Sequence, residues 1–331
     1  MRRSSAGMAP RGSGRSIPAI STSGLTKRFR DTLALDRLDL RVEQGETFGF
    51  LGPNGAGKST TLRLLLSLIR PTKGTAFVMG VPVSDVVRAH AHIGYVPGDV
   101  ALWPQLTGAE TLEFLGNLSG RIDVAFRDEL IERLLIDRDR RVRSYSKGNR
   151  QKIALAAAFM TRPDVLLLDE PTDGLDPLME AEFQSLVREA SQRGQTVFLS
   201  SHLLDEVEDV CDRVAILRSG RLVEVATLAD LRRLDATVYD VRVAGPVPGV
   251  EDTPGVTDVE RSPTGYRITV QGSPRDLLAL LGTVPVTDLR SHTASLEEIF
   301  LTYYDVSRSA REAVEAAHGG HLDEPARRDG R

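Results

Sequence analysis

The N-terminal part of the chain alternates between apolar and polar residues in short runs that are broken by turns. The clearest runs cover residues 20–25 and 33–42, and residues 75–79 and 93–96 have the pattern of two further strands. Alternation with a period of two is typical of strands that bury one face. The pattern therefore predicts an antiparallel sheet within residues 18–50, and the strands at 75–79 and 93–96 are predicted without assignment to a sheet.

Longer apolar runs and helical spacing dominate the middle of the chain. Residues 46–51, 165–168 and 196–200 are apolar runs of strand length, and such runs are typical of parallel strands buried on both faces. Apolar residues at helical spacing predict helices at residues 61–69, 110–118, 126–135, 147–160 and 179–193. Strands that alternate with helices indicate an α/β fold.

Residues 226–305 return to alternating strands and are predicted to form a small α+β domain. Its strands are expected at residues 238–243, 256–261 and 267–270, and its helices at residues 274–281 and 296–304. The second helix opens with the capping box Ser295-Leu296-Glu297-Glu298. Because this unit carries no recognisable catalytic cluster, packing is its expected role, and ligand binding or dimer stabilisation is the alternative.

Length and composition describe an ordinary folded protein. The chain has 331 residues, of which 41% are hydrophobic and 27% charged, and single cores rarely grow beyond about 250–300 residues. Two domains are therefore expected. Residues 1–17 and 306–331 lack periodicity and are predicted to be disordered tails. The net charge of −4 gives no support for a nucleic-acid partner.

The sequence contains neither a candidate membrane span nor a pair of cysteines. The longest apolar run, residues 153–160, is much shorter than the ~20 residues of a spanning helix. The arginine-rich N-terminus lacks the apolar stretch of a secretory signal. The single cysteine, Cys211, fits a reducing cytosol. Any role at a membrane is therefore expected to depend on a partner.

A phosphate-binding loop lies between the strand at 46–51 and the helix at 61–69. Its glycines let backbone N–H groups wrap a phosphate, and the N-terminus of the following helix attracts the same anion. Lys58 is expected near the β- and γ-phosphates, and Ser59 is expected to bind Mg²⁺. The predicted nucleotide-binding residues of the loop are Gly52, Pro53, Asn54, Gly55, Ala56, Gly57, Lys58, Ser59 and Thr60.

Polar side chains stand at the carboxyl ends of two of the predicted parallel strands. Ligands of open α/β sheets bind at this edge. Asp169 is therefore predicted to join the Mg²⁺ shell, and Glu170 to polarise a water for attack on the γ-phosphate. His202 is expected to contact a phosphate. Phe29, near the N-terminus, is either a stacking partner for a purine or a core aromatic.

Residues 18–225 resemble the ATP-binding subunits of ABC transporters. The resemblance rests on the order and spacing of the phosphate loop, the pair Asp169-Glu170, the Asp176 loop and His202. It implies a P-loop NTPase core with a RecA-like subdomain, an antiparallel β subdomain built from residues 20–50 and 75–97, and a helical subdomain at 99–160. It also implies ATP and Mg²⁺ as ligands, adenine stacking by Phe29, and catalysis by Lys58, Glu170 and His202.

The signature of that family, Leu-Ser-Gly-Gly-Gln, aligns with residues 145–149. Ser146 and Gly148 match the signature, whereas Lys147 and Asn149 depart from it. The resemblance implies that this segment closes over the γ-phosphate held by another subunit, with Asp176 in the loop between them. A homodimer, or another pair of cassettes, is then expected to enclose two ATP molecules. The simpler interpretation of Ser146 is a helix cap.

A second departure lies after Val96-Pro97, where the family usually has a glutamine and this chain has Gly98-Asp99. That glutamine senses Mg²⁺ and the attacking water, so its loss bears on rate and coupling more than on ATP binding. Asp99 is a hypothetical substitute ligand for the metal. Trp103 is expected either to contact a helix of the membrane subunit or to fill the core.

Residues 295–304 resemble the corresponding part of ABC-2 type exporters, including the daunorubicin-resistance-like group. The resemblance implies an ATPase that powers efflux through a separate ABC-2 permease and lies at the cytoplasmic face of a bacterial membrane. A drug or an antibiotic is the class of cargo that it suggests. The alternative is a soluble ABC-type ATPase that acts on ribosomes or DNA. Such proteins usually carry tandem cassettes or long coiled coils, and this chain has one cassette and no sustained heptads.

Overall fold

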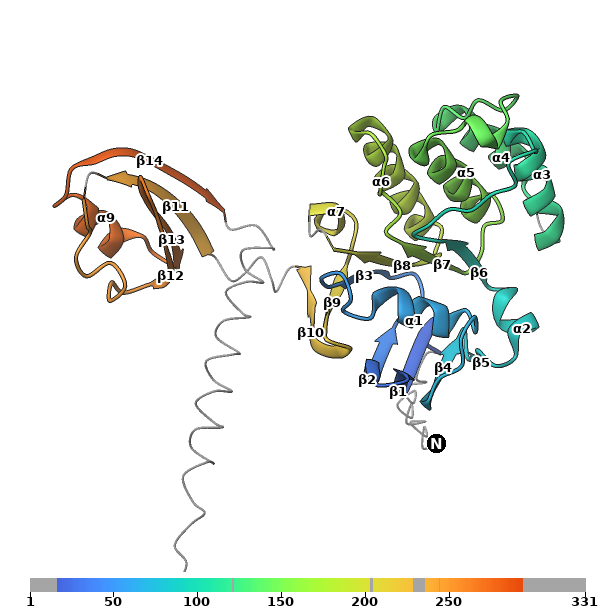
Figure 1. Cartoon of the computed structure of the whole chain (residues 1–331), viewed down its shortest axis with the longest axis horizontal. Coiled ribbons are helices and arrows are strands. Elements are labelled where there is room, and N and C mark those ends of the chain that lie inside the picture. Colours follow the sequence, from blue (N-terminus) through green and yellow to red (C-terminus); the bar gives the residue numbers. More distant parts are fainter. Residues whose placement is uncertain (1–16, 121, 203–204, 229–235, 244, 294–331) are drawn as a thin grey trace, which may run out of the picture. The chain divides into compact units, whose positions relative to one another are not determined.

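The computed structural model describes residues 17–120, 122–202, 205–228, 236–243 and 245–293. The described residues form two compact units: residues 205–208 group with the described residues after Ala226, and the other described residues form the first unit. The first unit contains two sheets and the second unit contains one (Figure 1). Apart from Ile17, the two predicted tails and the predicted helix at 296–304 lie outside the described residues.

The alternating N-terminal segments form the predicted antiparallel sheet. Its strand order is β2-β1-β4-β5, and β1 pairs antiparallel with both β2 and β4. The strands are β1 (Ile20–Phe29), β2 (Thr32–Val42), β4 (Lys73–Val78) and β5 (Val81–Pro82). Arg30 has a left-handed φ of 49° and lies in the tight turn that joins β1 to β2.

The second sheet of the first unit has the order β10-β9-β3-β8-β7-β6. Its strands are β3 (Thr47–Leu51), β6 (Ile93–Val96), β7 (Val165–Asp169), β8 (Thr196–Ser201), β9 (Arg213–Arg218) and β10 (Arg221–Thr227). The strands β3, β7 and β8 are buried along their whole length and pair in parallel. This confirms the α/β fold class.

Two strands do not lie where the family resemblance placed them. The ranges 20–50 and 75–97 were both expected in the antiparallel sheet, but β3 and β6 belong to the parallel sheet. All five residues of β3 are buried, so this strand needs a packed layer on each face. In β6, a Cβ on Gly94 would lie 2.7 Å from the carbonyl oxygen of Ala158, which shows how closely the helix α5 (Lys147–Phe159) covers this strand.

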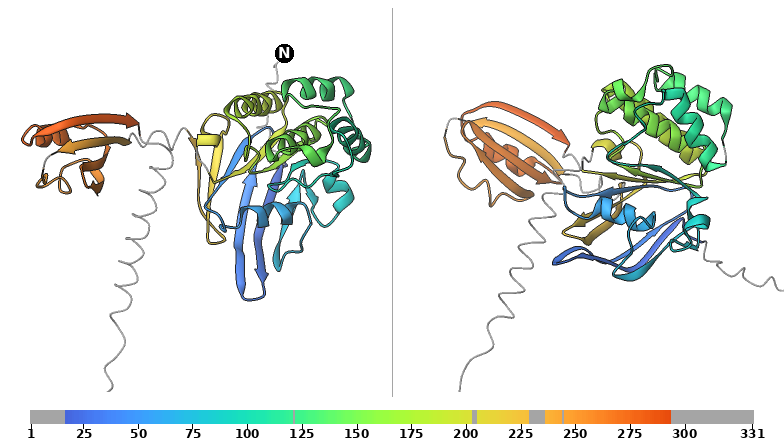
Figure 2. Two further views of the ribbon diagram at one scale, coloured as in Figure 1. Left: turned by 45° about the horizontal axis from the view of Figure 1, so that its top comes forward. Right: turned by 45° about the vertical axis from the view of Figure 1, so that its right-hand side comes forward.

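Helices cover both faces of the parallel sheet. Figures 1 and 2 show α1 between the two sheets, with α5 and α6 on the opposite side of the parallel sheet. The described helices of the first unit are α1 (Lys58–Leu65), α2 (Val86–His90), α3 (Gly108–Ser119), α4 (Val124–Arg133), α5 (Lys147–Phe159) and α6 (Pro177–Gln192), with a 3-10 turn at Val142–Ser144. The short helix α7 (Asp205–Glu208) follows β8 and groups with the second unit. A core with Phe48, Phe50 and Phe198 at its centre joins α1 to both sheets.

The second unit is a four-stranded antiparallel sheet with its own core. The strand order is β12-β13-β11-β14. Its elements are β11 (Ala236–Val243), β12 (Val256–Ser262), β13 (Gly265–Gln271), α9 (Arg275–Leu281) and β14 (Val286–Thr293). Tyr239, Ile268 and Leu277 lie in that core. The sequence did not predict β14, in which charged and polar residues obscure the alternation.

Candidate functional site

The phosphate loop connects β3 to α1 in the expected strand, loop and helix context. Gly55 and Gly57 have φ values of 82° and 113°, which favour glycine. A Cβ on Gly57 would also lie 2.7 Å from the carbonyl oxygen of Ala34. Because Gly57 is the N-cap of α1, the helix begins at Lys58, three residues before its predicted start. Pro53, Asn54 and Gly55 are exposed, so the loop is open to a ligand.

The tertiary structure brings the three candidate catalytic residues together. Lys58 is 5% exposed and donates to the carbonyl oxygen of Gly52 at 2.5 Å. Its Nζ also lies 3.1 Å from Glu170 Oε1. The other carboxylate oxygen of Glu170, Oε2, is 2.7 Å from His202 Nδ1. Charge-assisted contacts therefore connect Lys58 in the phosphate loop, through Glu170, to His202 just after β8.

Glu170 occupies an unusual backbone conformation. Its φ is 47°, in the left-handed region that side-chain-bearing residues seldom adopt. The Glu170 N–H donates to the carbonyl oxygen of Ser200 at 3.1 Å, which holds this conformation in place. Strained backbone of this kind often marks functional sites. Here it directs the Glu170 carboxylate toward Lys58 and His202.

Asp169 receives two hydroxyl hydrogen bonds on one oxygen. Ser200 donates to Asp169 Oδ1 at 2.7 Å, and Ser59 donates to the same oxygen at 3.2 Å. Oxygen ligands of this type suit Mg²⁺, which takes one or two carboxylates plus phosphate oxygens and water. Among the described residues no group of three acidic, histidine or cysteine side chains could hold a metal. Ser59 and Asp169 thus fit a metal that arrives with the nucleotide.

Tyr95 on β6 is a neighbour of this site that the sequence did not single out. Burial, with a smaller contribution from the negative charge of Asp169, raises the pKa of the Tyr95 hydroxyl to about 12. The positive charge of Arg63 acts in the opposite direction. The phenol is therefore protonated at neutral pH. Its environment depends on the pairing of β6 with β7, which the local sequence does not reveal.

The signature segment begins α5 and packs against the loop before α6. Ser146 is the N-cap and accepts a hydrogen bond from the Asn149 N–H at 3.2 Å. Lys147 pairs with Asp173 at 2.5 Å. A Cβ on Gly148 would lie 2.3 Å from the carbonyl oxygen of Gly174, so this contact needs a glycine. Ser146 is therefore a helix cap, as the simpler interpretation holds. The cap does not conflict with a contact between this segment and the γ-phosphate of another subunit.

Asp176 caps the next helix, and other candidate residues are exposed. Asp176 accepts from the Met179 N–H at 3.1 Å. Phe29 is 44% exposed with the Lys27 Nζ 4.8 Å from its ring centre, which excludes the core interpretation. Asp99 is exposed, and within the described part of the chain it forms no hydrogen bond to Asp169 or Ser59.

Comparisons with known proteins agree with this geometry. The family model for ABC transporters matches residues 35–173. The daunorubicin resistance ATP-binding protein DrrA3 of Streptomyces coeruleorubidus is 37% identical over 316 residues, which cover 89% of this chain and 99% of that protein. The chain belongs to the ABC transporter ATP-binding proteins. This ABC ATPase therefore binds ATP and couples its hydrolysis to transport.

Solved structures show the same cassette fold. The structure of an ATP-binding subunit of an ABC transporter matches with a TM-score of 0.61 and 28% identity, covering 65% of this chain and 92% of the other. A dimeric ATP-binding cassette in a post-hydrolysis state, bound to ADP and Pi, matches in fold with a TM-score of 0.57 and 23% identity over 63% of this chain and 98% of the other. None of the helices described in this ABC ATPase has both the length and the apolar character of a membrane span.

Proposed function

We propose that this ABC ATPase powers efflux through a separate ABC-2 type permease, with a drug or an antibiotic as the class of cargo. The observation that carries the proposal is the extent of the likeness to the daunorubicin resistance protein, which covers 89% of this chain. A match of that extent includes residues beyond Ala226 as well as the cassette. It favours an exporter subunit over an ATPase acting on ribosomes or DNA.

The contacts of the first unit support a specific division of labour at one ATP. Lys58 binds the β- and γ-phosphates, Ser59 and Asp169 hold Mg²⁺, and Glu170 accepts a proton from the attacking water. His202 orients Glu170 and reaches toward the γ-phosphate. Bound Mg²⁺ would neutralise phosphate charge. When Lys58 turns from Glu170 to phosphate, Glu170 Oε1 becomes free to accept that proton.

Two copies of the chain complete two ATP sites in this proposal. ABC cassettes dimerise and pair with membrane permease subunits. The signature residues Ser146, Lys147, Gly148 and Asn149 of one copy face the γ-phosphate bound by the other, at the N-terminus of α5. Asp176 lies in the adjoining loop. Residues 18–225 form the ATP-binding domain and residues 226–305 an accessory domain, and the permease holds the assembly at the cytoplasmic face of the membrane.

The Glu170→Gln variant tests this proposal. We expect it to bind Mg·ATP and to dimerise on size-exclusion chromatography, while turnover falls by a factor of about 10²–10⁴ because the base is lost. Glu113→Gln serves as a control, because Glu113 is exposed, and this variant should hydrolyse ATP normally.

Two results would count against it. Near-normal turnover would remove Glu170 from the role of base, and a variant that stays monomeric in saturating Mg·ATP would rule out the homodimer. The alternative function would be favoured if the protein co-sedimented with ribosomes or DNA and if no permease co-purified with it from membranes.

A further inference from the structure

Ser200 is a polar residue in a strand where every position is buried. It is 0% exposed and lies on β8 between the strand that leads to the phosphate loop and the strand that ends at Asp169. In the register of the sheet, Ser200 is opposite Phe50 on one side and Asp169 on the other. A hydroxyl at such a position is costly unless its hydrogen bonds are made.

The Ser200 side chain makes contact with both neighbouring acidic residues. Its Oγ donates to Asp169 Oδ1 at 2.7 Å in a fully buried hydrogen bond. The same Oγ accepts from the Glu170 N–H at 3.3 Å, and the Ser200 carbonyl oxygen accepts from that N–H at 3.1 Å. One residue therefore holds the carboxylate of Asp169 and the peptide of Glu170.

Both of these groups need an external restraint. Glu170 has a φ of 47°, and such a conformation persists only where surrounding contacts determine it. The Asp169 carboxylate can rotate, and its Oδ2 lies on the side of Gly98, where a Cβ would be 3.4 Å from that oxygen. Ser59 also donates to Oδ1 at 3.2 Å, but its hydroxyl must turn to the metal when Mg·ATP binds. After that change, the hydrogen bond from Ser200 still holds Oδ1, and it is the shorter of the two that the described residues donate to this oxygen.

We infer that Ser200 is a positioning residue for Mg·ATP hydrolysis. It keeps the Asp169 carboxylate in a fixed orientation and holds the Glu170 backbone so that its side chain points at the phosphate loop. The inference rests on the proposed roles of Asp169 and Glu170. Groups that orient a metal ligand typically change metal affinity or activity by about 10–100-fold when they are removed.

The test compares Ser200→Ala, Ser200→Thr and a matched control, Thr196→Val. Thr196 lies on the same strand, is 1% exposed and accepts from the Gly45 N–H at 3.0 Å, so its substitution removes a partly buried hydrogen bond away from the site. For each variant, the Kd of a fluorescent ATP analogue is measured with Mg²⁺ and with EDTA. The kcat and KM of ATP hydrolysis are measured for the same variants.

For Ser200→Ala we expect the gain in affinity on adding Mg²⁺ to fall by about 10-fold or more, and kcat to fall by a similar factor. The Kd in EDTA should stay at the wild-type value. Ser200→Thr keeps the hydroxyl and should restore both quantities, and Thr196→Val should change neither. If circular dichroism shows that Ser200→Ala is not folded, Ser200→Cys takes its place, because it leaves no cavity and its thiol is a weaker donor.

A Ser200→Ala protein that matches Thr196→Val in its Mg²⁺ effect and its kcat would overturn the inference. A change in Kd that is equal with and without Mg²⁺ would also overturn it, because that pattern indicates a general loss of structure. Wild-type protein that fails to bind Mg·ATP would instead refute the proposed function itself, so the two failures are distinguishable.

Discussion

Gly98 is one of the residues at which the sequence of this ABC ATPase departs from the family pattern. It stands where a glutamine is usual, and an added Cβ would lie 3.4 Å from Asp169 Oδ2, an ordinary contact distance. Gly98 does not have the positive φ of a residue that must be glycine. The backbone therefore allows a longer side chain here, and that side chain would project toward the Asp169 carboxylate.

Gly98→Gln should consequently fold normally and raise ATPase activity. One additional hydrogen bond in the site is worth about 0.5–1.5 kcal/mol, which corresponds to an increase in kcat of about 2–10-fold. Steady-state ATPase assays at saturating ATP measure the change. Gly98→Ala adds the Cβ without the amide and should leave kcat unchanged. Equal rates for the wild type and Gly98→Gln would mean that the amide has no role in this protein.

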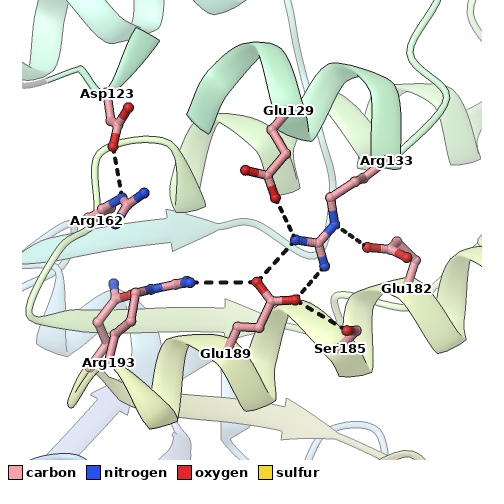
Figure 3. Close-up of polar contacts among 9 residues, drawn as sticks. Asp123, Glu129, Arg133, Arg162, Glu182, Ser185, Glu189 and Arg193 are labelled. Carbon is pink, nitrogen blue, oxygen red and sulfur yellow. Dashed lines mark hydrogen bonds and ion pairs between the residues drawn. The ribbon is translucent and has the colours of Figure 1, made fainter. Parts of the chain in front are cut away.

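At the scale of elements, an arginine cluster joins α4 to α6 (Figure 3). Arg133 on α4 contacts Glu182 and Glu189 on α6, each at 2.6 Å, and Glu129 on its own helix at 2.9 Å. The hydrogen bonds that Arg133 donates to Glu189 raise the pKa of Arg133, against a smaller lowering by desolvation. The contact with Arg133 in turn lowers the pKa of Glu189. The cluster therefore links α4, which packs against α5, to α6, which begins at the Asp176 cap.

Arg133→Met should destabilise the first unit by about 1–3 kcal/mol, between the values for exposed and for buried ion pairs. The substitution keeps an apolar side chain of similar length and leaves the glutamates without their shared cation. Urea unfolding at neutral pH measures the effect. Arg127→Met is the control on the same helix, since Arg127 contacts Asp128, which is 48% exposed, and should cost about 0–1 kcal/mol.

The loss should also depend on pH. Glu189 has a lowered pKa in the folded state, so its contribution is complete above its ordinary value of 4.5 and disappears as the pH falls through the lowered value. The difference in stability between the wild type and Arg133→Met should therefore shrink in acid. A difference that stayed constant from neutral pH to well below 4.5 would mean that the ion pairs do not provide it.

At the scale of the whole molecule, an aromatic pair on the surface bears on the partner of this ABC ATPase. Trp103 is 44% exposed and Phe114 on α3 is 41% exposed, and their rings meet edge to face with centroids 4.8 Å apart. Leu118, one turn further along α3, is 68% exposed. Trp103 therefore does not fill the core. Exposed aromatic clusters are typical of protein interfaces.

Trp103→Ala should weaken capture of the permease by at least about 10-fold, as expected for an aromatic anchor. The ATPase rate of the isolated chain should be unchanged, because Trp103 lies outside the phosphate site. Pull-down from detergent-solubilised membranes with the co-expressed permease measures binding. Val124→Ala is the control, because Val124 lies at the start of α4 and is 49% exposed. Wild-type capture by Trp103→Ala would exclude this surface as the docking site.

The sequence by itself predicted the features that depend on neighbouring residues. The phosphate loop is contiguous, and its chemistry follows from glycines, a lysine and a serine at fixed spacing. The α/β class followed from apolar runs that alternate with helical patterns. Asp169, Glu170 and His202 were singled out as candidates because each stands at or just after the end of an apolar strand, and ligands gather at the carboxyl ends of such strands.

Only the tertiary structure decided features that depend on strand order. Lys58 and Glu170 are far apart in the chain. They meet because β3 and β7 both run parallel to β8, so that their carboxyl ends lie at the same edge of the sheet. Ser200 has no local signal, since its partners come from the register of β8 with β7. The assignment of β3 and β6 to the parallel sheet and the exposure of Phe29 were settled in the same way. Burial on both faces and contacts between strands are properties of the packed molecule, and a local pattern of residues does not contain them.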